Sequence, residues 1–147
     1  MRRGLAGGAG AMTEPERKKA SYVGAPAIFL LELACKQINE AFGEENGAEY
    51  GCCFLVGSAL ERPDWRDVDV RMILDDAAFR RLFPAASMTP GVANWEFDVR
   101  WALMTSTISA HLSKITGLPI DFQFQPMTFA NERHKKPRNP LGLAFSS

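Results

Sequence analysis

In two segments of the chain, apolar residues recur with the spacing of a helix, and each segment therefore predicts a helix. From Pro26 to Phe42 they return every three or four positions, which predicts a helix that Gly43 ends. The same spacing runs from about Ala93 to Thr116 and predicts a long helix with one apolar stripe that begins at Phe97. Gly117 is the expected stop of this helix.

Three shorter segments have the pattern of strands. The first, Tyr50 to Val56, is apolar and aromatic, whereas Asp67 to Leu74 and Ile120 to Gln125 alternate polar and apolar residues. Asp75 and Asp76 offer a cap for a short helix from Ala77 to Phe83. The predicted fold class is therefore α/β or α+β, with a small central sheet and flanking helices on one side, and a fourth strand remains open.

The two ends of the chain differ from its middle. Residues 1–24 are glycine-rich and then charged, which predicts a flexible N-terminal segment before a domain at 25–130. Residues 131–147 are predicted to form a basic C-terminal tail, mobile or partly docked. This tail could contact nucleic-acid phosphates, but a solvated charged terminus is the more common explanation.

Composition narrows the class of protein. The 147 residues suffice for one domain, and 17 basic residues balance 17 acidic ones, which disfavours a strongly basic nucleic-acid binder. No apolar run approaches the roughly 18–20 residues that span a bilayer. The adjacent Cys52 and Cys53 would face opposite sides of a strand and cannot easily pair, so we expect a reduced, cytoplasmic protein.

Three aspartates and a glycine-serine pair are the candidate site. Asp67 and Asp69 lie two positions apart on a predicted strand and so face the same side, while Asp121 lies on a later strand. Clustered carboxylates repel one another unless a cation neutralises them, and Mg²⁺ (or Mn²⁺) prefers such oxygens together with substrate phosphates. Gly57 and Ser58 follow the first strand, where backbone N–H groups and a hydroxyl suit phosphate oxygens.

Basic and aromatic residues flank this site. Arg66 and Arg71 could neutralise a triphosphate, although Arg71 shares a face with Asp69 and could form an ion pair there instead. Trp65 lies in the site loop, where it either stacks on a nucleobase or packs in the core. His134, in the basic tail, is expected to be solvated.

With these residues in this order, the sequence resembles the polymerase-β-type nucleotidyltransferase superfamily. The resemblance covers about residues 26–126 and implies a mixed sheet, two Mg²⁺ ions and transfer of a nucleoside monophosphate from an NTP to a hydroxyl acceptor. It implies that Asp67, Asp69 and Asp121 bind metal, that Asp121 also helps to deprotonate the acceptor, and that Gly57 and Ser58 hold phosphate.

Many superfamily members carry a second, helical domain, and we expect no counterpart of it in residues 127–147. Small members without it often work with a partner protein, so a partner that supplies missing substrate contacts is expected. The alternative hypothesis is a catalytically inactive module of the same fold that binds nucleotide or a partner protein.

Overall fold

The computed structural model describes residues 21–86 and 95–143. Its helices are α1 (Ala27–Ile38), the π-helical turn η2 (Asn39–Glu44), α2 (Ser58–Glu61), α3 (Asp76–Leu82), the 3₁₀ turn η3 (Trp95–Phe97), α4 (Val99–Thr116) and α5 (Met127–Arg133). Its strands are β2 (Gly51–Val56), β3 (Val68–Leu74), β4 (Ile120–Pro126) and β5 (Asn139–Leu141). The predicted strands and the short helix are thus confirmed to within one or two residues.

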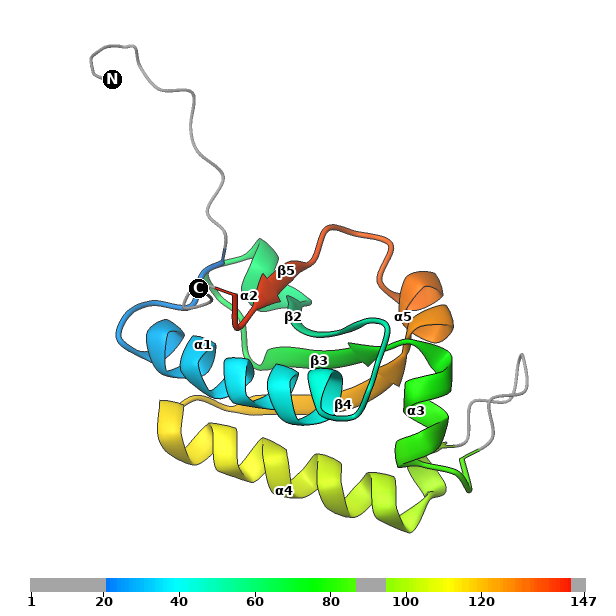
Figure 1. The fold of residues 1–147 in the computed structure, drawn as a ribbon. Helices are drawn as coiled ribbons and strands as arrows, with labels where there is room; N and C mark the ends of the chain where they lie inside the picture. Colours follow the sequence, from blue (N-terminus) through cyan, green and yellow to red (C-terminus); the bar gives the residue numbers. More distant parts are fainter. Residues whose placement is uncertain (1–20, 87–94, 144–147) are drawn as a thin grey trace, which may run out of the picture.

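The four strands form one mixed sheet in the order β4-β3-β2-β5 (Figure 1). β2 runs antiparallel to both β3 and β5, whereas β3 and β4 are parallel. The long connection through α3 and α4 lets β4 return parallel to β3, as a crossover between parallel strands requires. The predicted α+β fold class is confirmed, and the fourth strand that the sequence left open is β5.

One face of the sheet carries the hydrophobic core. Alternate residues of β3 and β4 point to this face, where α1 and α4 cover them (Figure 1). The buried members from the two strands are Val68, Val70, Met72, Leu74, Ile120, Phe122 and Phe124, and they pack with helix residues such as Leu31, Cys35, Trp101 and Leu112. The opposite face, which we call the open face, carries Asp69, Arg71, Asp121, Gln123 and Gln125.

Helix α4 also protects the outer edge of β4. The Trp101 indole donates to the carbonyl of Phe124 at 3.0 Å, and the Ser113 hydroxyl accepts from the Ile120 N–H at 3.0 Å. Ser109 accepts from the Phe122 N–H at 2.9 Å and lies 3.2 Å from the carbonyl of the same residue. These side chains supply the partners that an edge strand lacks.

The long helix begins later than the apolar spacing predicts. Asp98 caps α4 by accepting a hydrogen bond from the Trp101 N–H at 2.9 Å, so Phe97 lies outside the helix and is 83% exposed. The prediction that Phe97 joins the apolar stripe is therefore wrong, because a side-chain cap decided where the helix starts. The predicted residues 93 and 94 lie outside the described part of the chain.

The first helix continues past its expected end. Gly43 does not stop the helical path, which runs through the π-helical turn η2 to Glu44. A Cβ on Gly51 would come within 2.9 Å of the Gly43 Cα, so the two glycines let this turn approach β2 closely. Gly43 therefore marks a backbone contact rather than a helix end.

Parts of both predicted terminal segments are built into the domain. At the N-terminal end, Val23 is buried and the Tyr22 N–H donates to the carbonyl of Ala59 at 2.8 Å. At the other end, α5 runs across the expected boundary at residue 130, and β5 pairs with β2. Residues 131–143 are thus docked, whereas residues 1–20 and 144–147 lie outside the described chain.

Two further observations concern the cysteines and the length of the helices. Cys35, Cys52 and Cys53 are all free thiols. Within residues 21–86 and 95–143, no helix has the length and apolar character needed to cross a membrane.

Candidate functional site

The strand register brings two of the predicted aspartates side by side. Asp69 pairs directly with Asp121 across the parallel strands β3 and β4, and it pairs with Val56 at the end of β2. Paired residues of neighbouring strands point to the same face. Asp69 and Asp121 therefore share the open face, and Gly57 follows immediately beyond the end of β2.

Gly57 adopts a backbone conformation that other residues rarely reach. Its φ of 79° and ψ of −155° fall in a region populated almost only by glycine. A Cβ at this position would collide with the Oδ2 atom of Asp69. The glycine thus both permits the turn into α2 and leaves room for the Asp69 carboxylate.

Arg71 lies between the two carboxylates on the open face. One guanidinium nitrogen, Nη2, is 3.3 Å from Asp121 Oδ2 and 3.9 Å from Asp69 Oδ1, and Nη1 donates to the carbonyl of Asp121 at 2.7 Å. The residue is 8% exposed, and its Nε atom has no hydrogen-bond partner in the described part of the protein. Of the two roles the sequence left open for Arg71, ion pairing with Asp69 is the one seen.

The surroundings of Asp69 disfavour the ionised form of its carboxylate. Partial burial raises the pKa of Asp69 above its usual range, and the negative charges of Asp121 and Asp67 add to this, while Arg71 opposes it. A cation or a proton at this carboxylate would relieve that penalty. Asp69 is therefore a carboxylate at which a bound cation would be favoured.

A cavity of about 560 Å³ opens over this part of the sheet. Polar groups from β3 and β4 form its floor, and aromatic and basic groups from η3, α5 and the following loop form its walls. Its lining residues are Val56, Gly57, Asp69, Arg71, Trp95, Glu96, Gln123, Gln125, Phe129, Arg133 and His134. We call it the site cavity, and its volume falls in the range of small-molecule sites.

The predicted site residues separate into two groups around this cavity. Gly57, Asp69 and Arg71 line it, and Asp121 joins them through its ion pair with Arg71. Ser58, Arg66 and Asp67 do not line it; Ser58 begins α2, while Arg66 and Asp67 are exposed in the loop before β3. Trp65, the other candidate, donates its indole N–H to the carbonyl of Tyr22 at 3.0 Å and lies outside the cavity lining.

The donor set suits one divalent cation better than two. Asp69 and Asp121 supply carboxylate oxygens on one face, and Mg²⁺ is commonly held by one or two carboxylates together with substrate phosphates. Across residues 21–86 and 95–143, no group of three or more His, Cys, Asp or Glu side chains is close enough to hold a metal. A site for two ions would need Asp67 to approach and Arg71 to withdraw.

Several cavity residues were not among the predicted site residues. Gln123 and Gln125 belong to the alternating strand that carries Asp121, and that alternation was the available signal for them. Arg133 and His134 were assigned to a basic tail, and His134 was expected to be solvated. Instead its Nε2 lies 2.9 Å from Gln125 Oε1, because the path from α5 to β5 carries this segment back over the sheet.

The pH dependence of stability should report this placement of His134. Burial lowers the pKa of His134 from 6.5 to about 4, with the charges of Arg71, Arg138 and Arg133 adding to the effect. As the pH is lowered, the unfolded chain therefore gains this proton before the folded chain does. The free energy of unfolding should consequently decrease as the pH falls from about 6.5 to about 4.

We expect His134→Gln to flatten that part of a urea-unfolding profile measured against pH. His111→Gln, at an exposed position on α4, is the matched control and should leave the profile unchanged. Profiles of equal slope for wild type and His134→Gln would show that the imidazole titrates as it does in the unfolded chain.

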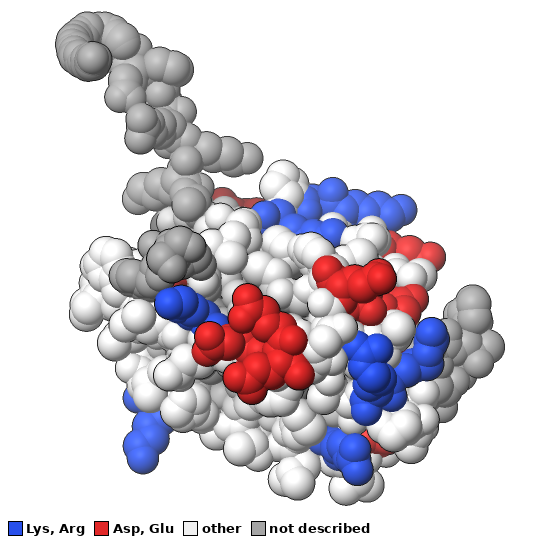
Figure 2. Space-filling view, viewed as in Figure 1, with Lys and Arg blue, Asp and Glu red and all other residues white. Residues whose placement is uncertain are grey.

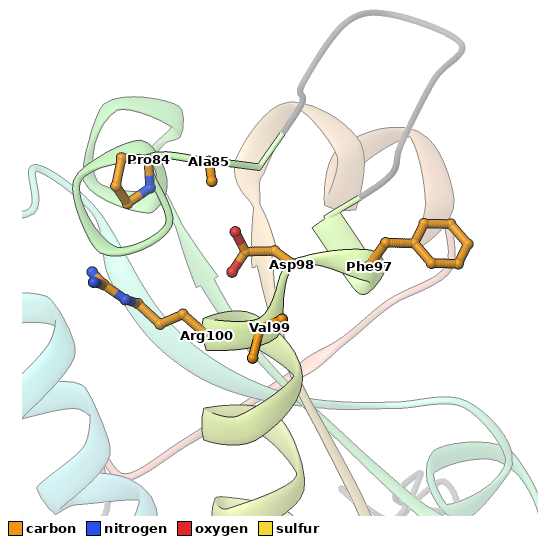
Figure 3. Close-up of a pocket in the computed structure, with 6 residues that line it drawn as sticks. All are labelled: Pro84, Ala85, Phe97, Asp98, Val99 and Arg100. Carbon is orange, nitrogen blue, oxygen red and sulfur yellow. The ribbon is translucent and has the colours of Figure 1, made fainter.

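A second cavity, of about 550 Å³, lies between the end of α3 and the start of α4. Figure 3 shows Asp98 and Arg100 extending toward Pro84, while the Phe97 ring points away from them. None of the predicted site residues lines it. The open face of the sheet is therefore the better candidate for chemistry.

Comparison with models of protein families, with curated proteins and with solved structures found no match to this chain.

Proposed function

We propose that this protein is a nucleotidyltransferase that moves a nucleoside monophosphate from an NTP to a hydroxyl acceptor, with Mg²⁺ or Mn²⁺ as the cofactor. The observation that carries the proposal is the pairing of Asp69 with Asp121 on one face of the sheet, where Asp69 and the positive-φ Gly57 both line the site cavity. Neighbouring carboxylates can bind a cation, and a glycine beside them lets a phosphate group approach the backbone closely.

Residues of the open face and the adjoining turn would bind the cation and the phosphate groups. Asp69 and Asp121 would hold the cation, which stabilises the negative charge that develops on the phosphate oxygens. Gly57 has no side chain to obstruct a phosphate group near Asp69. Arg71 would exchange its carboxylate partners for a phosphate oxygen, for which a guanidinium is well suited.

The reaction would proceed by attack of an acceptor hydroxyl oxygen on the α-phosphorus of the NTP. A new oxygen–phosphorus bond forms, the bond to the bridging oxygen breaks, and pyrophosphate leaves with the electron pair of that bond. Asp121, whose side chain is half exposed, would receive the hydroxyl proton.

Label transfer from α-³²P-labelled NTPs tests this function. With Mg²⁺ and a mixture of protein, nucleic-acid and small-molecule acceptors, we expect wild type to transfer label and Asp69→Asn to lose about a hundredfold or more. Asp64→Asn, in an exposed loop, is the matched control because it removes an equal charge outside the cavity.

The stability of Asp69→Asn separates lost chemistry from lost folding. Because burial raises the pKa of Asp69, its ionised form opposes folding at neutral pH, and a neutral amide should leave the free energy of unfolding equal or higher. Wild-type label transfer that persists in Asp69→Asn would dismiss catalysis at this site.

Arg71 favours a second candidate, the catalytically inactive module that binds nucleotide. Its guanidinium already provides a positive charge to Asp69 and Asp121, in the position that a metal would occupy. Under this reading, calorimetry should detect NTP binding that does not depend on Mg²⁺, with no label transfer. Metal-dependent turnover would exclude it.

A further inference from the structure

A second hollow continues the site cavity toward the loop after α5. It has a volume of about 340 Å³ and shares Val56, Gly57, Arg133 and His134 with the site cavity. Lys135 and Lys136 also line it. The two hollows therefore meet at Gly57, and one of them leads away from the carboxylates toward basic side chains.

Arginines from several elements lie near the shared wall residue His134. Arg71 comes from β3, Arg133 from the end of α5, and Arg138 from the residue before β5. After burial itself, the charges of all three arginines act to lower the pKa of His134, which lines both hollows. Figure 2 shows Lys and Arg side chains gathered along the edge of the molecule above the connection from α5 to β5.

The acidic residues of the hollow leave part of this charge uncompensated. Lys136 forms an ion pair with Glu61 at 3.5 Å, and Glu132 also lines the hollow. The side chains of Arg133 and Lys135 form neither an ion pair nor a hydrogen bond with any described residue, and both are exposed. These two cations are therefore available to an anion that enters beside Gly57.

We propose that Arg133 and Lys135 bind the polyphosphate tail of the nucleotide, with Gly57 at the point where that tail passes from the site cavity into the adjoining hollow. The nucleoside then lies in the site cavity, whose walls include Trp95 and Phe129 and whose floor includes the amides of Gln123 and Gln125. This assignment rests on the proposed function for the nucleoside, whereas the anion site can be measured without turnover.

Titration calorimetry with inorganic tripolyphosphate tests the anion site directly. We expect wild type to bind it, and Arg133→Ala and Lys135→Ala each to weaken binding about tenfold or more, because each removes a charge-assisted contact. Lys114→Ala removes an equal charge from the last turn of α4, outside both hollows, and should bind as wild type does.

The same titrations with Mg-ATP and with a single-stranded RNA 12-mer separate the possible sources of phosphate. Weaker binding of ATP in both variants supports the proposal, and binding of RNA alone overturns it in favour of a nucleic-acid surface. Failure of wild type to bind tripolyphosphate, or equal losses in Lys114→Ala, also overturns it. Arg133-dependent binding of tripolyphosphate and ATP without label transfer would remove the proposed catalysis and leave the anion site standing.

Discussion

Replacing Phe124 with alanine should destabilise the protein by about 3–5 kcal/mol, the largest stability loss expected for a single substitution here. The Phe124 ring is fully buried, and its centroid lies 5.1 Å from that of Phe42, 5.3 Å from that of Phe83 and 5.0 Å from that of Phe122. Removing it loses the transfer free energy of the ring and leaves a cavity between β4, η2 and α3.

Urea unfolding followed by tryptophan fluorescence measures this loss, provided that the dependence on urea keeps the same slope. Phe97→Ala is the matched control, because that ring is 83% exposed and its removal should change stability by no more than about 0.5 kcal/mol. A loss below about 1 kcal/mol in Phe124→Ala would show that β4 is not anchored by this aromatic cluster.

Replacing Gly57 with alanine should have the second-largest effect, because it acts on both folding and the site. The new side chain would be held at φ 79° and ψ −155°, at a cost of about 1–3 kcal/mol. Its Cβ would also displace the carboxylate of Asp69, which ends a short side chain with few alternative positions. We therefore expect a fall in unfolding free energy together with loss of Mg-ATP binding.

Gly117→Ala separates the two parts of this effect. Gly117 also has a positive φ, of 73°, but nothing lies within 4 Å of its added Cβ. It should lose about 1–2 kcal/mol of stability from the left-handed conformation and keep nucleotide binding. Equal nucleotide binding by Gly57→Ala and wild type would mean that Asp69 and the turn beside it take no part in the site.

Local chemistry explains why most elements could be predicted from the sequence. The strand-period alternation of Asp67 to Leu74 separates core positions from open-face positions in any context, because successive side chains of a strand point to opposite sides. Asp75 and Gly117 were recognised as a helix cap and a helix stop because both act on backbone groups within a few residues.

The candidate site could be predicted only in part. Gly57, Asp69 and Asp121 were identified from the sequence because residue type and position along a predicted strand are enough to recognise them. Gly57 follows one strand, and the two aspartates lie on the polar faces of two others. Asp67 belonged to the same pattern, yet it lies exposed before β3 begins. The register of β3 with β4 decides that Asp69 and Asp121 lie directly opposite each other.

The sequence by itself determined the two-sided character of the strands, the order of most elements and the polar residue types available to a site. Only the tertiary structure decided that Asp69 pairs with Asp121, that Arg71 lies between them, and that Arg133 and His134 reach the same cavity. The physical reason is that these arrangements depend on strand register and on β5 joining β2, which are set by packing between segments far apart in the chain.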